Sequence, residues 1–136
     1  MNILWIKDGK KGHEKQVSVL LEELGKNINI NIYEEECTLS RLKKALFLID
    51  CFLLKLGSFF KKNNSFIARL SNKQIIKFEE KKINIVIGAG SGPQIQLLKY
   101  KQEFDTKIIS VLTPAFFQEK YDLICSPVHD NNRYKK

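Results

Sequence analysis

One polar loop near the start of the chain combines residue types that could bind an anion or move a proton. It runs from Asp8 to Gln16 and reads Asp-Gly-Lys-Lys-Gly-His-Glu-Lys-Gln. Two glycines, Gly9 and Gly12, let the backbone turn tightly and approach a ligand closely. A helix that begins near His13 would offer free N–H groups and a partial positive charge, which favour an anion. His13 could then act as a base or hold a phosphate, with Asp8 fixing its tautomer.

The same loop also fits a purely structural role, in which Asp8 caps a turn and His13 enters a helix. It contains neither the GxxxxGK[ST] pattern of a P-loop nor the GxGxxG pattern of a dinucleotide site. The loop chemistry alone therefore leaves ligand binding and a structural turn both open.

A second glycine-rich loop spans residues 88–94 and reads Gly-Ala-Gly-Ser-Gly-Pro-Gln. Its spacing is GxGxG, and no acidic residue follows about 20 positions later, so NAD binding is disfavoured. A glycine turn into a helix still suits a phosphate or a sugar ring packed on the backbone. The alternative is a close strand-to-helix turn that serves packing only. The candidate binding residues of this loop are Gly88, Gly90, Ser91, Gly92 and Gln94.

The last group of chemical interest is the pair His129–Asp130, which follows Pro127 near the end of the sequence. A His-Asp pair after a strand could bind a ligand hydroxyl. It could equally cap the end of a sheet.

Alternating apolar runs and amphipathic stripes predict the elements that carry these loops. Strands are expected at residues 3–6, 28–33, 83–87, 107–112 and 121–125. Helices are expected from near residue 13 to a stop at Gly25, across residues 42–53, over 65–72, and from Pro93 to Phe104. This alternation indicates an α/β domain with a Rossmann-like, doubly wound and mostly parallel sheet. Five of the seven glycines follow the first and third predicted strands, at the edge where such sheets bind ligands.

Composition narrows the class of protein. The 136 residues are enough for one domain, and 43% hydrophobic with 28% charged residues argue against disorder. The net charge of +8 permits anionic partners, but the scattered lysines and the lack of a known motif disfavour nucleic acid. The three cysteines have no metal spacing, so a reducing cytoplasm without a zinc site is expected. No signal-peptide pattern and no charge-free stretch long enough to cross a membrane is visible.

The motif Asp-Gly-x-x-Gly-His-x-x-Gln at residues 8–16 resembles the opening motif of the mitochondrial fission factor family. That family is also described as nucleoside-diphosphate-sugar glycosyltransferases. The later run is similar to the middle of the family: Ile85, Gly88-Ala89-Gly90, Thr113-Pro114, Asp122-Leu123 and Pro127-Val128-His129-Asp130. The order and spacing agree over most of the chain, whereas residues 37–80 match poorly.

The resemblance implies a GT-B glycosyltransferase fold, with two Rossmann-like domains facing across a cleft. The loops around Gly12 and Gly90 are similar in kind to those of the membrane-associated N-acetylglucosaminyltransferase of peptidoglycan synthesis. In that architecture the N-terminal domain mostly receives the acceptor, and the C-terminal domain mostly holds the nucleotide sugar. Residues 1–136 then form a single acceptor-side domain without the nucleotide-sugar domain. We expect activity only with a second domain or a partner subunit.

The resemblance also implies roles for individual residues. His13, supported by Asp8, would take the proton of the acceptor hydroxyl or orient the acceptor. The donor is a nucleotide-diphosphate sugar, and no metal or other cofactor is expected. The remaining residues expected to bind substrate are Gly9, Gly12, Gln16, Gly88, Gly90, Ser91, Gly92, Gln94, Thr113, Pro114, His129 and Asp130.

Two questions stay open on the sequence. The apolar stretch 45–60 and its flanking lysines, within residues 43–62, could lie on an anionic membrane surface, which would suit a lipid-linked acceptor. It could also be a helix packed on the sheet. We expect a cytoplasmic protein, which is peripheral at the membrane if the stretch 45–60 binds a membrane surface. The alternative function is a non-enzymatic adaptor that binds a membrane or a protein, as the name of the family suggests.

Overall fold

The computed structural model describes residues 1–37, 45, 70–115 and 117–126, and these form an α/β domain around one sheet. The sheet has five strands in the order β2-β1-β3-β4-β5, and every neighbouring pair is parallel. The strands are β1 (Asn2–Lys7), β2 (Asn31–Glu36), β3 (Ile85–Ala89), β4 (Lys107–Val111) and β5 (Leu123–Cys125). The predicted Rossmann-like, doubly wound sheet is confirmed.

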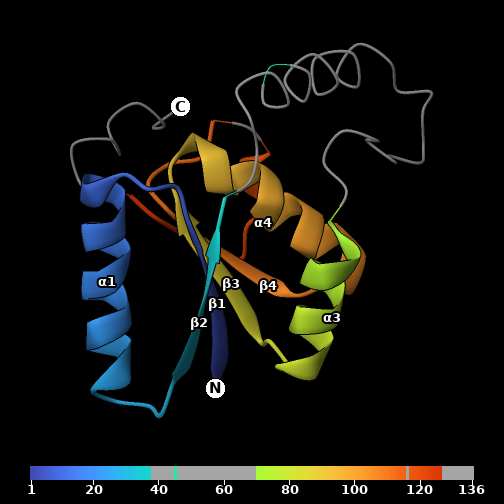
Figure 1. Cartoon of the computed structure of the whole chain (residues 1–136). Helices are drawn as coiled ribbons and strands as arrows, with labels where there is room; N and C mark the ends of the chain where they lie inside the picture. The colour runs from blue at the N-terminus through green and yellow to red at the C-terminus, as the bar shows by residue number, and fades with distance from the viewer. Residues whose placement is uncertain (38–44, 46–69, 116, 127–136) are drawn as a thin grey trace.

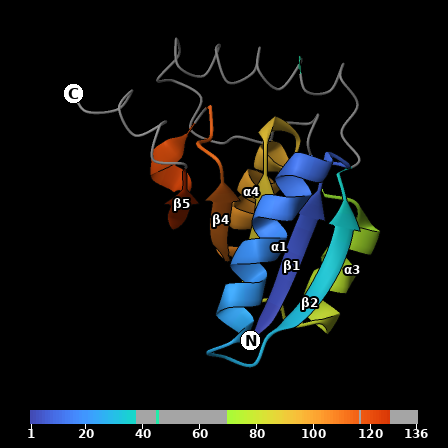
Figure 2. The same cartoon turned by 90° about the vertical axis from the view of Figure 1, so that its left-hand side faces the viewer.

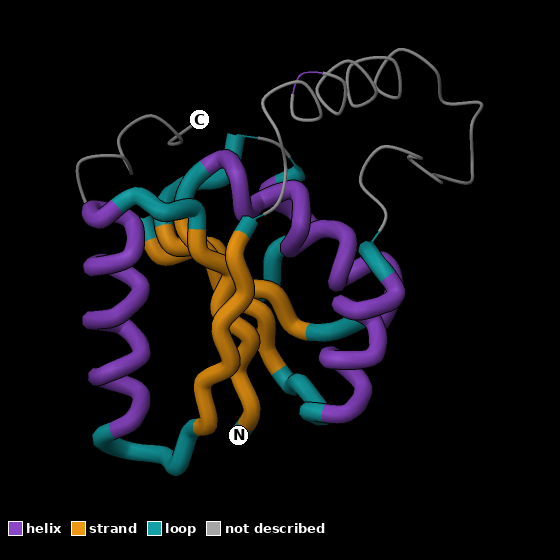
Figure 3. The backbone as a smooth tube through the Cα atoms, viewed as in Figure 1, coloured by secondary structure: helices purple, strands orange, loops and turns teal. Residues whose placement is uncertain are grey.

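Helices cover both faces of the sheet. Helix α1 (Lys11–Gly25) lies on one face, and α3 (Asn72–Glu80) and α4 (Ser91–Phe104) lie on the other (Figure 1). The view turned by 90° places α1 in front of the sheet, between the edge strands β2 and β5 (Figure 2). The backbone tube shows the same layers, with the strands between the helices (Figure 3). A short 3-10 helix (Gln118–Lys120) precedes β5.

The core consists of two apolar layers that share the central strands. Ile3 and Trp5 of β1 point towards α1, whereas Leu4 and Ile6 point towards α3 and α4. All four side chains are buried, because β1 has a strand on each side and helices over both faces. Burial of one such side chain contributes about 1.5–3 kcal/mol to folding. The strand that carries the Asp8 loop is therefore firmly held.

The strand order reverses between β1 and β3. From β1 the chain moves outwards to β2, and it later returns on the other side of β1 to form β3. In open α/β sheets the crevice at the carboxyl ends of such a strand pair is the usual ligand site. The loops after β1 and β3 meet there.

Strand β2 lies three residues later than predicted. The alternation from Ile28 to Tyr33 predicts a strand over 28–33, but pairing begins with Asn2 opposite Asn31. The Asn31 N–H donates to the Met1 carbonyl at 2.9 Å, and residues 28–30 are not paired with β1. Ile28 precedes the strand and Ile32 lies on an edge strand, and each is 43% exposed. The start of β1 thus decides where β2 can begin.

Helix α1 ends at Gly25 as predicted, and Lys26 follows in a right-handed conformation. Helices α1 and α4 each begin two residues earlier than predicted, at Lys11 and Ser91. Helix α3 was not predicted, although a capping box marks its start: the Gln74 N–H donates to Ser71 Oγ at 3.3 Å, and the Ser71 N–H donates to Gln74 Oε1 at 2.8 Å.

Several predictions fall on residues that the structure does not describe. They are the helix over 42–53, most of the helix over 65–72, the stretch 45–60 apart from Ala45, and the lysines of the segment 43–62. Among the helices that are described, none is long and apolar enough to span a bilayer.

Candidate functional site

Asp8 and His13 form a hydrogen-bonded pair directly after β1. Asp8 Oδ2 lies 2.7 Å from His13 Nδ1, and Asp8 Oδ1 accepts the Lys10 N–H at 3.1 Å. The Asp8 side chain is 7% exposed and that of His13 is 25% exposed. When Nδ1–H donates its hydrogen bond to the Asp8 carboxylate, the neutral imidazole keeps Nε2 as its proton acceptor. Gly9, with φ +75°, makes the turn that lets the chain fold back on Asp8.

Gly90 of the second loop packs against this pair. A Cβ built at residue 90 would lie 2.5 Å from both His13 Nδ1 and His13 Cε1, and 3.1 Å from Asp8 Oδ2. Gly90 also has φ +81°, a conformation that other residues rarely adopt. Only glycine therefore allows the β3 loop to approach the imidazole this closely. The structure brings Asp8, His13 and Gly90 together at the crevice between β1 and β3.

Two helix N-termini face this edge of the sheet. Helix α1 follows Lys10 and helix α4 follows Gly90, and neither cap residue covers its helix with a side-chain hydrogen bond. The first N–H groups of a helix lack intrahelical acceptors, and they carry a partial positive charge. Ser91, the first residue of α4, is exposed. The chemistry available is a proton acceptor on His13 beside N–H groups that favour an anion.

The other predicted glycines have different surroundings. A Cβ at Gly88 would lie 2.7 Å from Pro93 Cβ and 3.2 Å from the Ile6 carbonyl, so this glycine lets α4 pack closely on the sheet. A Cβ at Gly12 would meet no atom within 4 Å, so Gly12 borders open space in the first turn of α1. Gly92 is buried in the first turn of α4.

Gln94 and Pro114 are buried and hold the loop after β4. Gln94 Oε1 accepts the Ala115 N–H at 3.4 Å, and its carbonyl accepts from the Tyr121 hydroxyl at 3.3 Å. The Pro114 carbonyl accepts from Gln118 Nε2 at 3.0 Å. Gln94 therefore ties α4 to the segment that leads into β5, and Pro114 holds a turn within that segment.

Three further residues complete the predicted set. Thr113 Oγ1 is buried and has no hydrogen-bond partner among the described residues. Gln16 is exposed on α1, one turn after His13. His129 and Asp130 lie outside the residues that the structure describes.

Comparison of the sequence with models of known protein families identifies the family of this chain. Over residues 11–136 it matches the family model described as Mitochondrial fission ELM1. The chain belongs to the Mitochondrial fission ELM1 family. The match includes His13, Gly90 and every described element except β1, whereas Asp8 lies just before it. No curated protein and no solved structure matches the chain.

The charges beside the Asp8–His13 pair of this Mitochondrial fission ELM1 family member are partly neutralised. Lys7 Nζ lies 3.2 Å from Glu34 Oε2 and 3.8 Å from Glu14 Oε2. The hydrogen bond with Glu34 raises the pKa of Lys7. Lys7 therefore pairs with acids of β2 and α1. Three lysines at the start of α1 are exposed, and they add positive charge near the helix N-terminus: Lys10, Lys11 and Lys15.

Sequence reasoning missed a polar cluster between β2 and the helices α3 and α4. It joins Glu35 to Gln74, Gln96 and Tyr100. The run of three glutamates at residues 34–36 contains no signal that the middle one faces inwards. As for metals, no three His, Cys, Asp or Glu side chains gather into a cation site in the described ranges 1–37, 70–115 and 117–126.

Proposed function

We propose that this chain is the acceptor-side half of a glycosyltransferase, which moves a sugar from a nucleotide-diphosphate donor to an acceptor hydroxyl. The observation that carries the proposal is the Asp8–His13 pair, packed against Gly90 where the β1 and β3 loops meet. A proton acceptor held by a carboxylate at the ligand edge of a doubly wound sheet is suited to activating a hydroxyl.

In the proposed reaction, His13 Nε2 takes the proton of the acceptor hydroxyl. The hydroxyl oxygen forms the new bond to the anomeric carbon, while the bond from that carbon to the diphosphate oxygen breaks. Asp8 keeps the ring in the required tautomer and stabilises the imidazolium that forms. General base catalysis of this kind typically contributes about 10²–10⁴-fold to the rate.

The leaving diphosphate takes up negative charge, and the N–H groups of the first turn of α4 are suited to stabilise it. Gly90, the cap residue of α4, lies against the imidazole, so this first turn begins beside His13. A second Rossmann-like domain, in the same polypeptide or in a partner subunit, would hold the nucleoside and close the cleft. The positive charge of the chain suits an acceptor that itself carries phosphate, such as a lipid-linked one.

The test is nucleotide release by the native assembly that contains this chain, isolated from its source with whatever copurifies. A panel of nucleotide-diphosphate sugars is supplied, and the free nucleotide diphosphate is measured by mass spectrometry, with and without lipid extract. Sugar-dependent release that disappears in His13→Ala supports the proposal. Release that is unchanged in His13→Ala removes His13 from catalysis. No release from any donor favours the adaptor alternative.

A further inference from the structure

One carboxylate lies in the layer between the sheet and the helices α3 and α4. Glu35 is the last residue but one of β2 and pairs with Ile6, which faces that layer. Its Oε1 accepts from Gln74 Nε2 at 2.7 Å and from Gln96 Nε2 at 2.9 Å. The Tyr100 hydroxyl lies 3.0 Å from Glu35 Oε2 and 3.3 Å from Oε1. A single side chain thus binds three residues from two helices.

The cluster is made of polar groups that lie largely out of contact with water. Gln96 is 4% exposed and Tyr100 is 0% exposed, so both polar groups have been removed from water. Gln96 directs its amide nitrogen to Glu35, and its Oε1 is left buried without a hydrogen-bond partner among the described residues. Burial and the charge of Glu35 raise the pKa of Tyr100, so its hydroxyl remains a donor. Apolar side chains of similar volume would often stabilise such a layer at least as well.

The geometry of the bonds indicates what the cluster supplies instead. Gln96 and Tyr100 are four residues apart, so they lie on the same stripe of α4, one turn from each other. Because both bind the same carboxylate, they fix the rotation of α4 about its axis and its position along β2. The close approach of Pro93 to Gly88 and the apolar packing of Leu97 hold α4 on the sheet, and the bonds to Glu35 add directional restraints to that packing.

The rotation of α4 matters at its N-terminus. Gln96 is about 9 Å along the helix from Gly90, at a rise of about 1.5 Å per residue. Gly90 already touches the imidazole, so a small rotation of α4 changes the contact with His13 and the direction of the Ser91 N–H. We propose that Glu35 is a positioning residue, which sets α4 so that its first turn meets His13 correctly. The inference concerns the site of the proposed function and does not depend on sugar transfer.

The experiment compares NMR spectra of the full chain carrying Glu35→Gln or Tyr100→Phe with those of the unmodified chain. Each substitution keeps the size of its side chain and removes part of the network. We expect the backbone amide resonances of residues 90–92 and the ring resonances of His13 to shift in both variants, more strongly in Glu35→Gln. Asp122→Asn is the matched control, since it loosens Lys101 near the other end of α4 without touching Glu35.

The control separates positioning from a general loss of stability. In Asp122→Asn the unfolding midpoint should fall, while the resonances of His13 and residues 90–92 stay in place. Site resonances that stay unchanged in Glu35→Gln and Tyr100→Phe would overturn the proposal, as would equal shifts in the control. If Glu35→Gln does not fold, Tyr100→Phe decides the question. No donor or acceptor is needed, so failure of the glycosyltransferase proposal would leave this result intact.

Discussion

Gly90 and His13 lie in contact across the crevice between β1 and β3, and a Cβ at residue 90 would approach His13 Nδ1 to 2.5 Å. The contact joins two loops that are more than 70 residues apart in the sequence. It also makes the position of the imidazole depend on α4, because Gly90 caps that helix.

The first prediction concerns this contact. Gly90→Ala should lower stability by about 1–3 kcal/mol, because φ +81° is strained for alanine and its methyl group would displace His13. Denaturant unfolding measures the change. Gly12→Ala is the matched control, since a Cβ there meets nothing within 4 Å, and it should be neutral or stabilising. Equal stability of Gly90→Ala and the unmodified chain would contradict the described contact.

The second prediction tests the proposed base. His13→Ala in the native assembly should lower kcat by about 10²–10⁴-fold. Its unfolding midpoint should also fall, because the Asp8 carboxylate, which is 7% exposed, loses the hydrogen bond with Nδ1, so turnover is compared at a temperature where both proteins are folded. Val19→Ala, an exposed change on the same helix, should leave the turnover as it is. Steady-state release of nucleotide diphosphate is the measurement, and a loss of activity shared by both variants would speak against a specific role.

The third prediction concerns packing beneath the site. Gly88→Ala should destabilise the protein by about 1–3 kcal/mol, because its methyl group would overlap Pro93 and press on the Ile6 carbonyl. The overlap involves a proline ring and backbone, which cannot move aside easily. Thermal unfolding with Gly12→Ala as the reference checks it. A Gly88→Ala variant as stable as the reference would show that α4 can move away from β3 without cost.

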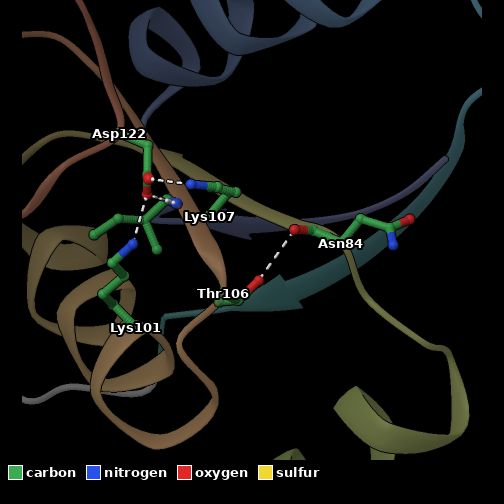
Figure 4. A network of polar contacts seen from close by, with 6 residues as sticks. Asn84, Lys101, Thr106, Lys107 and Asp122 are labelled. Carbon is green, nitrogen blue, oxygen red and sulfur yellow. Dashed lines mark hydrogen bonds and ion pairs between the residues drawn. The ribbon is translucent and has the colours of Figure 1, made fainter.

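The fourth prediction is an acid-dependent loss of stability at Asp122. Partial burial acts against its charge, but the Ile108 N–H and the ammonium groups of Lys101 and Lys107 lower the pKa of Asp122 from 3.8 to about 2 (Figure 4). Asp122 therefore makes its full contribution to the free energy of unfolding above the unfolded pKa of 3.8. This contribution is lost as the pH falls towards about 2.

Asp122→Asn tests this linkage. The substitution should lower the free energy of unfolding by about 1 kcal/mol at neutral pH. The value is modest because solvent screens the ion pair with the exposed Lys107. The difference from the unmodified chain should shrink steadily between pH 4 and pH 2 in chemical unfolding experiments. A difference that stays constant over that range would mean that Asp122 has an ordinary pKa in the folded state.

Much of the fold was predictable, because parallel strands leave local patterns. The apolar runs after Asn2 and before Gly88, and the stripe through Val17 and Leu21, predict their elements without any tertiary information. The position of β2 was not predictable from its own alternation. Strand pairing with β1 begins at Asn2 and Asn31, and an isolated pattern does not contain its partner.

The sequence predicts that special backbone residues gather at the carboxyl ends of β1 and β3, since strand order along the chain places Gly9, His13 and Gly90 after strands. The function of each glycine depends on the packing of the folded chain. Gly12, Gly88 and Gly90 are chemically identical, and their roles differ because of the atoms around them: open space, a proline ring or an imidazole. The inward direction of Glu35 was likewise decided by register, because pairing with Ile6 turns this glutamate towards α4.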